Sequence, residues 1–280
     1  MTVDAWAGQY LAIKSRADCR DMDVRRAWVR CFCRSFGHQA LGAIDGAQVF
    51  EWRQSLEARC LKPNTIRSAM AYISNFFTEA VRAGLAGQNP ARGIGRPRAE
   101  KRRRFLDQGE AERLRRASPP WLSRFIGLGL ETGFRPGELM GLRWPNVDFQ
   151  LELISLGAAE SKNGRGRDMP MTPDAEEILR AARAAARNGY VLTGPHGEQI
   201  SKDKLLRAFR KAALAAGLED VTPHVLRHTF ASWMAQSGES LYLIGQLLGH
   251  ASPETTQRYA HLAHKQLRAA LIRGLHPPKS

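Results

Sequence analysis

The chain has 280 residues, of which 43% are hydrophobic and 25% are charged, and its formal net charge at pH 7 is +15. This length allows two domains that each bury a core, and the absence of any stretch approaching about 20 apolar residues excludes a membrane-spanning helix. The basic excess makes a polyanion the natural partner, with nucleic acid ahead of a membrane surface because no basic amphipathic tail is present.

The basic excess is spread along the chain. Residues 1–100 carry 15 Lys and Arg against 9 Asp and Glu, and the remaining residues carry 27 against 18. Both halves are therefore expected to touch the polyanion, as a two-part clamp would. The first residues also lack the basic start and apolar run of a secretory signal, which predicts a cytoplasmic, nucleoid-associated protein.

The first third of the chain has a helical pattern. From Trp6 to about Leu85, apolar residues recur at helical spacing and strand signals are few. The pattern is clearest in residues 65–84, where five apolar side chains recur at this spacing: Ile66, Met70, Ile73, Phe76 and Phe77. Residues 1–95 are therefore predicted to form a small helical bundle.

The same region contains all four cysteines, Cys19, Cys31, Cys33 and Cys60. With His38 nearby they could form a zinc site, but the "CFC" spacing is one residue shorter than the usual C-x₂-C ligand pair. Reduced thiols in a cytoplasmic helical domain are the favoured interpretation, and no metal site is predicted.

A basic linker follows the bundle. The stretch "GQNPARGIGRPRAEKRRRFL" is rich in Gly, Pro and basic residues and has no apolar period, and the linker is placed at residues 96–104. Its arginines, Arg102, Arg103 and Arg104, could be a solvated surface run. The overall charge and the position between two basic domains favour contact with a phosphate backbone.

Residues 105–280 are predicted to form a mainly helical second domain with a small antiparallel β-sheet. A strand-rich patch covers residues 146–171, where the dipeptide Asn163-Gly164 is a hairpin-turn signal. Helical patterns surround it, at residues 107–117, 119–133, 172–189 and 202–217.

Three later stretches each place a proline at a first helical position. In "TGFRPGEL", the Thr132-Gly133 pair ends one helix and Pro136 starts the next, so that Arg135 projects from a helix N-terminus. Glu138 falls in the first turn, where an acid suits the helix dipole.

In "VTPHVLRHTFASWMAQSG", Thr222 is the expected N-cap of a helix that Pro223 opens and Gly238 closes. His224 and Arg227 lie three residues apart and share a face of this helix.

In "LLGHASPETTQRYAHL", Ser252 is the expected cap, Pro253 opens a helix, and Tyr259 is expected two turns into it. His250 lies just outside, after the stop at Gly249.

Free N–H groups at helix N-termini suit a phosphate oxyanion, and a tyrosine beside them could attack it. Taken singly, each residue has an ordinary explanation: a surface arginine, a polar cap, or a tyrosine packed in the core. His224 and His228 have the i, i+4 spacing of metal ligands, but the glutamate of H-E-x-x-H is missing, so a metal is not favoured. The combination favours nucleophilic chemistry on a phosphate.

The order and wording of these motifs resemble the tyrosine recombinase family, also called phage integrases, over nearly the whole chain. "ETGFRPGEL" resembles its first arginine box, "HVLRHTF" its H-x-x-R box, and "LLGHASPETTQRYAH" its closing box. The resemblance places six residues in catalytic positions: Arg135, Lys162, His224, Arg227, His250 and Tyr259. It makes residues 1–95 a core-binding domain, whose "KPNTIRS" stretch contributes Lys62, Thr65 and Arg67 to DNA binding, and residues 105–280 the catalytic domain.

The resemblance also implies a mechanism. Tyr259 would attack the scissile phosphate to give a 3′-phosphotyrosine link and a free 5′-hydroxyl, and Lys162 would protonate the leaving 5′ oxygen. Two arginines and a histidine, Arg135, Arg227 and His250, would hold the non-bridging oxygens, and His224 would assist proton transfer. No ATP, metal or other cofactor is expected. The expected partners are double-stranded DNA and three further copies of the chain, as a homotetramer on two DNA sites formed from monomers in solution.

Two other functions share many of these features: DNA relaxation of the type IB topoisomerase kind, and DNA binding without chemistry. The short segment after Tyr259 favours a recombinase over a topoisomerase, and the full set of six polar residues disfavours a silent binder. Because the core-binding pattern begins within the first ten residues, no arm-binding domain is expected, as in compact recombinases of mobile elements and of chromosome-dimer resolution.

Overall fold

The computed structural model describes residues 1–17, 21–95, 97, 104–157, 166–184, 188–250 and 252–260. The chain divides into two compact units, Met1–Arg102 and Arg103–Ser280. The predicted fold class is confirmed, because the described residues are mainly helical and include one three-stranded antiparallel sheet. Among them, no helix has both the length and the apolar character needed to span a membrane.

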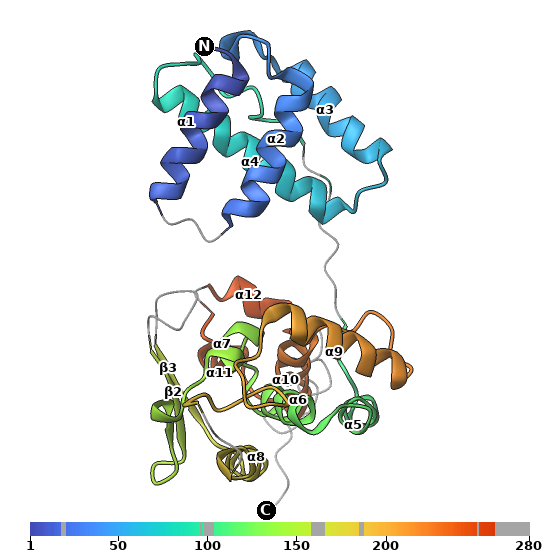
Figure 1. Ribbon diagram of the computed structural model, residues 1–280. Helices are drawn as coiled ribbons and strands as arrows, with labels where there is room; N and C mark the ends of the chain where they lie inside the picture. Colours follow the sequence, from blue (N-terminus) through green and yellow to red (C-terminus); the bar gives the residue numbers. More distant parts are fainter. Residues whose placement is uncertain are drawn as a thin grey trace, which may run out of the picture. The chain divides into compact units, whose positions relative to one another are not determined.

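The described residues of the first unit form four α-helices and a short 3₁₀ helix, η1 (Figure 1). Polar caps fix two of the helix starts: Thr2 accepts a hydrogen bond from the Ala5 N–H, and Asp45 forms a reciprocal capping box with Gln48. The elements are α1 (Val3–Arg16), α2 (Met22–Phe36), η1 (Leu41–Ala43), α3 (Gly46–Ala58) and α4 (Pro63–Arg82).

Helix α4 supplies the largest share of the first core. The five apolar residues predicted to recur along it are all buried, which confirms the pattern seen in the sequence. Phe32 of α2 packs edge-on against Phe77 of α4 and Trp52 of α3, with ring centroids 5.7 and 5.2 Å apart. The Trp6 indole N–H donates to the Phe76 carbonyl at 3.2 Å, so this buried N–H has a partner within the core.

The cysteines of this unit are free thiols at the three described positions, Cys31, Cys33 and Cys60, while Cys19 lies outside the described residues. Burial, together with the neighbouring Asp4 carboxylate, raises the pKa of Cys33 to about 12. The thiol therefore stays protonated and unreactive at neutral pH. Within the described ranges, no group of three or more His, Cys, Asp or Glu could hold a metal ion.

The second unit places a small sheet at one side of a group of helices (Figure 1). The helices predicted at residues 107–117, 119–133, 172–189 and 202–217 and the strands predicted within residues 146–171 are present inside those ranges. The elements are α5 (Gln108–Arg116), α6 (Pro120–Thr132), α7 (Pro136–Gly141), η2 (Trp144–Asn146), β1 (Val147–Asp148), β2 (Leu153–Leu156), β3 (Arg167–Pro170), α8 (Pro173–Ala184), α9 (Lys202–Ala215), α10 (Pro223–Ser237), α11 (Leu241–Leu248) and α12 (Glu254–Gln257).

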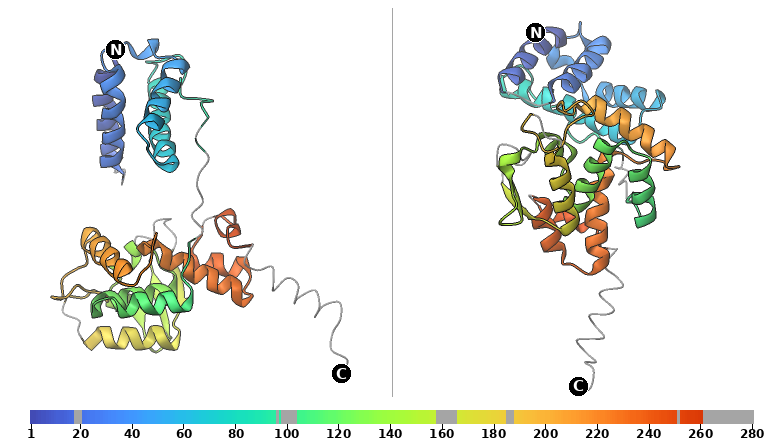
Figure 2. Two further views of the ribbon diagram at one scale, coloured as in Figure 1. Left: turned by 90° about the vertical axis from the view of Figure 1, so that its right-hand side faces the viewer. Right: turned by 60° about the horizontal axis from the view of Figure 1, so that its bottom comes forward.

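Helix α6 is the central helix of the second unit and packs against both α8 and α10, far away in the sequence (Figure 2). Two glycines permit this approach. A Cβ at Gly127 would lie 2.7 Å from Ile178 Cδ1 of α8, and a Cβ at Gly129 would lie 2.9 Å from Leu226 Cδ1 of α10. The small residues of "FIGLGLETG" therefore set how closely the next two helices can pack.

The sheet has the order β1-β2-β3 with both pairs antiparallel. Ile154 lies opposite Met169, and both side chains are buried against the helices. The predicted turn at Asn163-Gly164 lies outside the described residues, as does Lys162.

Residues at the start of the second unit are fastened to α10. The Leu106 N–H donates to Thr229 Oγ1 at 2.9 Å, and the Trp233 indole N–H donates to the Leu106 carbonyl at 2.9 Å. Arg104 forms two hydrogen bonds with the Glu110 carboxylate at the start of α5. These contacts hold the first residues of the second unit against α5 and α10.

Candidate active site

Pro136 and Pro223 open α7 and α10 as predicted, whereas Pro253 is the N-cap of α12 and takes the place expected for Ser252. Left-handed glycines precede the site residues of the first and third of these helix starts. Gly133 ends α6 with φ 61° just before Arg135 and Pro136, and Gly249 ends α11 with φ 64° just before His250. A Cβ at Gly133 would lie 2.5 Å from a ring carbon of Phe230 on α10, so this turn needs glycine for both its conformation and its packing. A left-handed glycine turn therefore precedes Arg135 by two residues and His250 by one.

Arg227 joins these two turns. Its guanidinium is buried and donates to the Gly133 carbonyl at 3.0 Å and to the Leu248 carbonyl at 2.7 Å. Each carbonyl lies two residues before a predicted site residue, Arg135 or His250. Burial, aided by the nearby charge of Arg135, lowers the pKa of Arg227 to about 9, which still leaves it charged at neutral pH.

Glu138 is the carboxylate at the centre of a cationic group that consists of Arg135, Arg167 and Arg227. Its carboxylate accepts from the Arg135 guanidinium at 2.8 Å, from the Arg135 N–H at 2.8 Å, and from Arg167 at 2.7 Å. Burial alone would raise the pKa of Glu138, but the hydrogen bonds from Arg167 and Arg135 lower it below its usual value. The sequence placed Glu138 in the first turn of α7, but gave no sign of its pairing with Arg167.

Arg167 extends this group toward His250. Its guanidinium carbon lies 5.0 Å from the centre of the Phe134 ring, and its Cδ would lie 3.0 Å from a Cβ at Gly249. Arg167 is not among the site residues predicted from the sequence. It lies two residues before Met169 on β3, so the two side chains share the inward face of the strand, and this shared face is the local signal that could have found it.

His250 is partly buried and its Nδ1 lies 2.7 Å from Thr256 Oγ1 in a hydrogen bond. Burial, followed by the charges of Arg227 and Arg135, lowers the pKa of His250 to about 4. The imidazole is therefore neutral at neutral pH in the absence of an anion.

The prediction that Tyr259 lies two turns into a helix is wrong. Helix α12 begins at Glu254, one residue after Pro253, and ends at Gln257, so Tyr259 lies just beyond it. The Tyr259 N–H donates to the Thr256 carbonyl at 3.0 Å, which is an i→i+3 bond of the 3₁₀ kind. Two adjacent threonines are weak helix formers, and Thr256 also bonds His250, so the α-helical turn does not continue.

Tyr259 itself is buried, and its phenol oxygen lies 2.7 Å from His228 Nδ1 in a hydrogen bond. Burial raises the pKa of Tyr259, and the charges of Arg258 and Arg227 partly oppose this. Burial also lowers the pKa of His228 to about 4, together with the charges of Arg258, His224 and Arg227. The sequence presented His228 only as a possible metal-ligand partner of His224.

The structure thus brings Arg135, Arg227, His250 and Tyr259 into one charged neighbourhood. His224 lies on α10 one turn before His228 and is exposed, while Lys162 lies outside the described residues.

Of the six predicted DNA-binding residues, four lie among the described residues. Lys62 is exposed at the N-cap of α4, Thr65 is partly buried, and Arg67 donates to the Pro97 carbonyl at 3.0 Å. Arg104 is paired with Glu110, as described above, and Arg102 and Arg103 lie outside the described residues.

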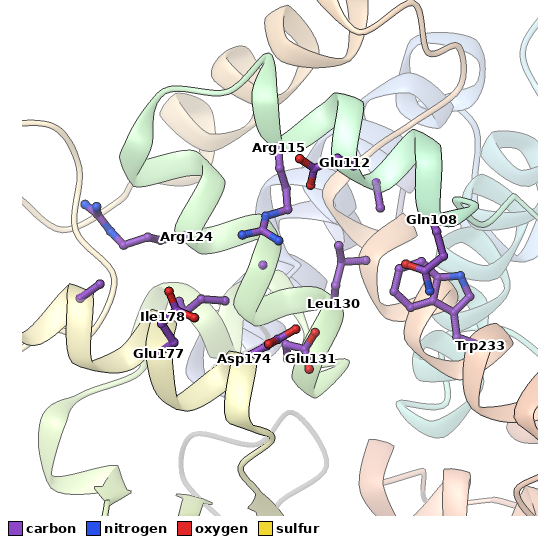
Figure 3. Close-up of a pocket in the computed structure, with 13 residues that line it drawn as sticks. Gln108, Glu112, Arg115, Arg124, Leu130, Glu131, Asp174, Glu177, Ile178 and Trp233 are labelled. Carbon is purple, nitrogen blue, oxygen red and sulfur yellow. The ribbon is translucent and has the colours of Figure 1, made fainter.

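A pocket of about 380 Å³ lies elsewhere in the second unit, among α5, α6 and α8, with Trp233 of α10 at one end (Figure 3). It contains none of the predicted site residues. Four carboxylates line it, Glu112, Glu131, Asp174 and Glu177, together with two arginines, Arg115 and Arg124. The carboxylates outnumber the arginines, so this pocket is less suited to a phosphate than the group formed by Arg135, Arg167 and Arg227.

Comparisons with known proteins identify the family of the chain. The model of the phage integrase family matches residues 104–266. The tyrosine recombinase XerC of Xylella fastidiosa (strain 9a5c) is 32% identical over 271 residues, which cover 92% of this chain and 91% of that protein.

Two solved structures share the fold over nearly the whole chain. One is the Tn1549 transposon integrase in complex with a circular intermediate DNA (TM-score 0.82, 17% identity, 96% of this chain and 99% of that one). The other is a lambda integrase tetramer bound to a Holliday junction (TM-score 0.79, 20% identity, 90% and 78%). The chain belongs to the phage integrase family and is a tyrosine-type site-specific recombinase.

Proposed function

We propose that this recombinase cleaves and rejoins DNA through a 3′-phosphotyrosine intermediate in which Tyr259 is the nucleophile. The observation that carries the proposal is the position of Arg227. Its guanidinium bonds the backbone just before Arg135 and just before His250, and its charge acts on the Tyr259 phenol. Three predicted site residues are thus organised around the fourth.

The charge balance of this group suits a phosphodiester. Three guanidinium groups, from Arg135, Arg167 and Arg227, surround one carboxylate, that of Glu138, and leave an excess of positive charge. Arg135 and Arg227 hold the non-bridging oxygens, with His250 as a third donor once the anion is bound. Preorganised cations of this kind stabilise the charge that develops as the phosphate is attacked.

The remaining chemistry concerns protons. Lys162 protonates the leaving 5′ oxygen, which frees it without a metal, and His224 assists proton transfer. Because the bond energy is kept in the phosphotyrosine link, rejoining needs no ATP.

The two units divide the work on DNA. The helical residues 1–95 form the core-binding domain, with Lys62, Thr65 and Arg67 on DNA, and residues 105–280 form the catalytic domain. The basic linker at residues 96–104 follows the phosphate backbone. The excess of basic residues in both halves of the chain supports this clamp.

Four copies act together on two DNA sites and exchange strands through a four-way junction, in the cytoplasm where the nucleoid lies. The fold shared with a lambda integrase tetramer on a Holliday junction supports this assembly. The recombination is of the kind that moves mobile elements or resolves chromosome dimers.

The test is a DNA substrate nicked beside the scissile phosphate, which traps the covalent intermediate. Tyr259→Phe keeps the ring and loses the nucleophile, so DNA binding should persist and the SDS-resistant adduct should vanish. Tyr242→Phe is the matched control, because Tyr242 is 78% exposed on α11 and should not affect adduct formation.

An adduct that survives in Tyr259→Phe would assign the nucleophile to another residue. Joining of two separate duplexes by the unmodified protein distinguishes recombination from topoisomerase-like relaxation of a single duplex. A chain that binds DNA without any adduct would be a silent DNA-binding homologue.

A further inference from the structure

His228 contacts the atom that would react. Its Nδ1 lies 2.7 Å from the Tyr259 phenol oxygen, while the two rings are 6.2 Å apart between centroids and tilted by 49°. The contact is therefore made by the polar atoms at the ring edges and is not a stacking interaction. His228 follows Arg227 directly on α10, so one helix presents both the central cation and this imidazole to the phenol.

The protonation states suit a hydrogen bond from the phenol to the imidazole. Burial, with the charges of Arg258, His224 and Arg227 around the ring, lowers the pKa of His228 to about 4, so the ring is neutral at neutral pH. Burial raises the pKa of Tyr259, so the phenol keeps its proton. A neutral imidazole has one nitrogen with a free lone pair, and with its proton on Nε2 it accepts at Nδ1.

Resting on the proposed function, we propose that His228 is the catalytic residue that accepts the phenolic proton of Tyr259 during DNA cleavage. As the phenol oxygen bonds to phosphorus, its proton passes to Nδ1, and the bond from phosphorus to the 5′ oxygen breaks. The electron pair of that bond leaves with the 5′ oxygen, which takes its proton from Lys162.

In the rejoining step the 5′-hydroxyl returns its proton to the neutral Lys162 amine as its oxygen bonds to phosphorus. The bond from phosphorus to the phenol oxygen breaks, and the His228 imidazolium returns the proton to that oxygen. Arg227 and Arg258 stabilise the negative charge while the proton is in transit. This assignment differs from the one that the family resemblance implies, in which His224 assists proton transfer. His224 lies one turn earlier on α10 with its side chain exposed, whereas His228 lies directly on the reacting oxygen.

The first experiment separates accepting a proton from merely positioning the phenol. His228→Asn offers an amide oxygen close to the place of Nδ1, which accepts a hydrogen bond but cannot take up the proton. The rate of adduct formation on the nicked substrate should fall by about 10²- to 10⁴-fold with DNA binding unchanged. His196→Asn, on an exposed loop of the same unit, is the matched control and should retain the wild-type rate.

The pH dependence gives a second readout. Without an internal base, the variant depends on the ionised fraction of the phenol, which rises about tenfold per pH unit below the phenol pKa. The ratio of the wild-type rate to the His228→Asn rate should therefore shrink by about tenfold per unit between pH 6 and 8. A ratio that stays constant would mean that His228 only positions Tyr259, and would overturn the proposal.

Two further measurements show which step of cleavage is slowed in the His228 variants. A 5′-bridging phosphorothiolate, whose thiolate leaves without a proton, should not rescue His228→Asn, because the lost step is at the nucleophile. Imidazole added to His228→Ala should raise the rate of adduct formation, which also shows that the variant is folded.

The competing assignment gives the opposite pattern. If His224→Asn shows the pH-dependent ratio and His228→Asn does not, the proton acceptor is His224. If the unmodified protein forms no adduct through Tyr259, the proposed function fails, and the role of His228 with it.

Discussion

Arg167 and Glu138 form a buried ion pair in which the guanidinium reaches both carboxylate oxygens, at 2.7 and 3.3 Å. Because Glu138 also accepts from Arg135, the first residue of β3 and the first arginine of the site share one carboxylate. Lys162 lies five residues before Arg167 in the chain. We infer that Glu138, by pairing with both arginines, fixes the position of β3, the strand that follows Lys162, relative to Arg135.

Glu138→Gln should destabilise the protein, because it removes the negative charge that pairs with the buried Arg167 guanidinium and with the partly exposed Arg135 guanidinium. Removing one member of a buried ion pair typically costs about 3–5 kcal/mol. The free energy of unfolding, measured with urea at pH 7, should fall by an amount of this order. A change below about 1 kcal/mol would show that water or an ion replaces the carboxylate.

The same variant should alter the acid sensitivity of the protein. The pKa of Glu138 is lower in the folded than in the unfolded state, so its contribution is fully present above the unfolded value and is lost as the pH falls through the folded value. Glu138→Gln should therefore lose less stability than the wild type between about pH 5 and 3. Parallel curves of unfolding free energy against pH would contradict the shift.

Gly249→Ala should impair catalysis more than its cost in stability explains. Gly249 has φ 64°, and a Cβ there would lie 3.0 and 3.1 Å from Arg167 Cδ and Nη1. Gly217→Ala is the matched control, because Gly217 has φ 68° and a Cβ there meets nothing within 4 Å.

Both alanines carry the left-handed cost of about 1 kcal/mol, which thermal unfolding should detect equally. Only Gly249→Ala pushes Arg167 and the adjacent His250 out of place, and a displacement of about 1 Å can cost about 10²-fold in rate. Adduct formation should therefore fall at least about tenfold in Gly249→Ala and stay near wild type in Gly217→Ala. Equal rates in the two variants would show that Arg167 adapts.

Local signals in the sequence predicted the framework of the site well. Proline and glycine fix backbone angles by their own chemistry, so Pro136, Pro223, Gly133 and Gly249 mark where helices begin and end without reference to the rest of the fold. Hydrophobic periodicity likewise identified the buried face of α4.

Contacts between distant segments could not be predicted in the same way. His228 and Tyr259 are 31 residues apart, and Glu138 and Arg167 are 29 apart, so only the packing of α10 and β3 brings each pair together. The i, i+4 spacing of His224 and His228 is a local signal, but it could suggest only a metal site, which the missing glutamate disfavoured, because Tyr259, the neighbour of His228, lies on another segment. The short α12 is also a tertiary effect, since Thr256 bonds His250.

Salt dependence should separate the roles of the linker arginines. Each phosphate that is neutralised contributes about 0.9 to the slope of log K against log salt concentration. Replacing Arg102 and Arg103 with alanine should flatten this slope by up to about 1.8, whereas Arg104→Ala should change it less because Arg104 is paired with Glu110. Binding isotherms at several salt concentrations give the slope, and no change in the double variant would make these residues a solvated run.

Lys162→Ala should slow cleavage of ordinary DNA by about 10²- to 10⁴-fold, the usual contribution of a general acid. On a 5′-bridging phosphorothiolate the leaving thiolate needs no proton, so this variant should cleave at nearly the wild-type rate. Arg135→Ala is the contrast: it removes a cation from the non-bridging oxygens, and the sulfur substitution should not rescue it. If Lys162→Ala is equally slow on both substrates, the lysine only binds the phosphate backbone of the DNA and is not the general acid. Rescue of Arg165→Ala or Arg167→Ala instead would move the acid along the hairpin, although the pairing of Arg167 with Glu138 already commits that guanidinium to a structural bond.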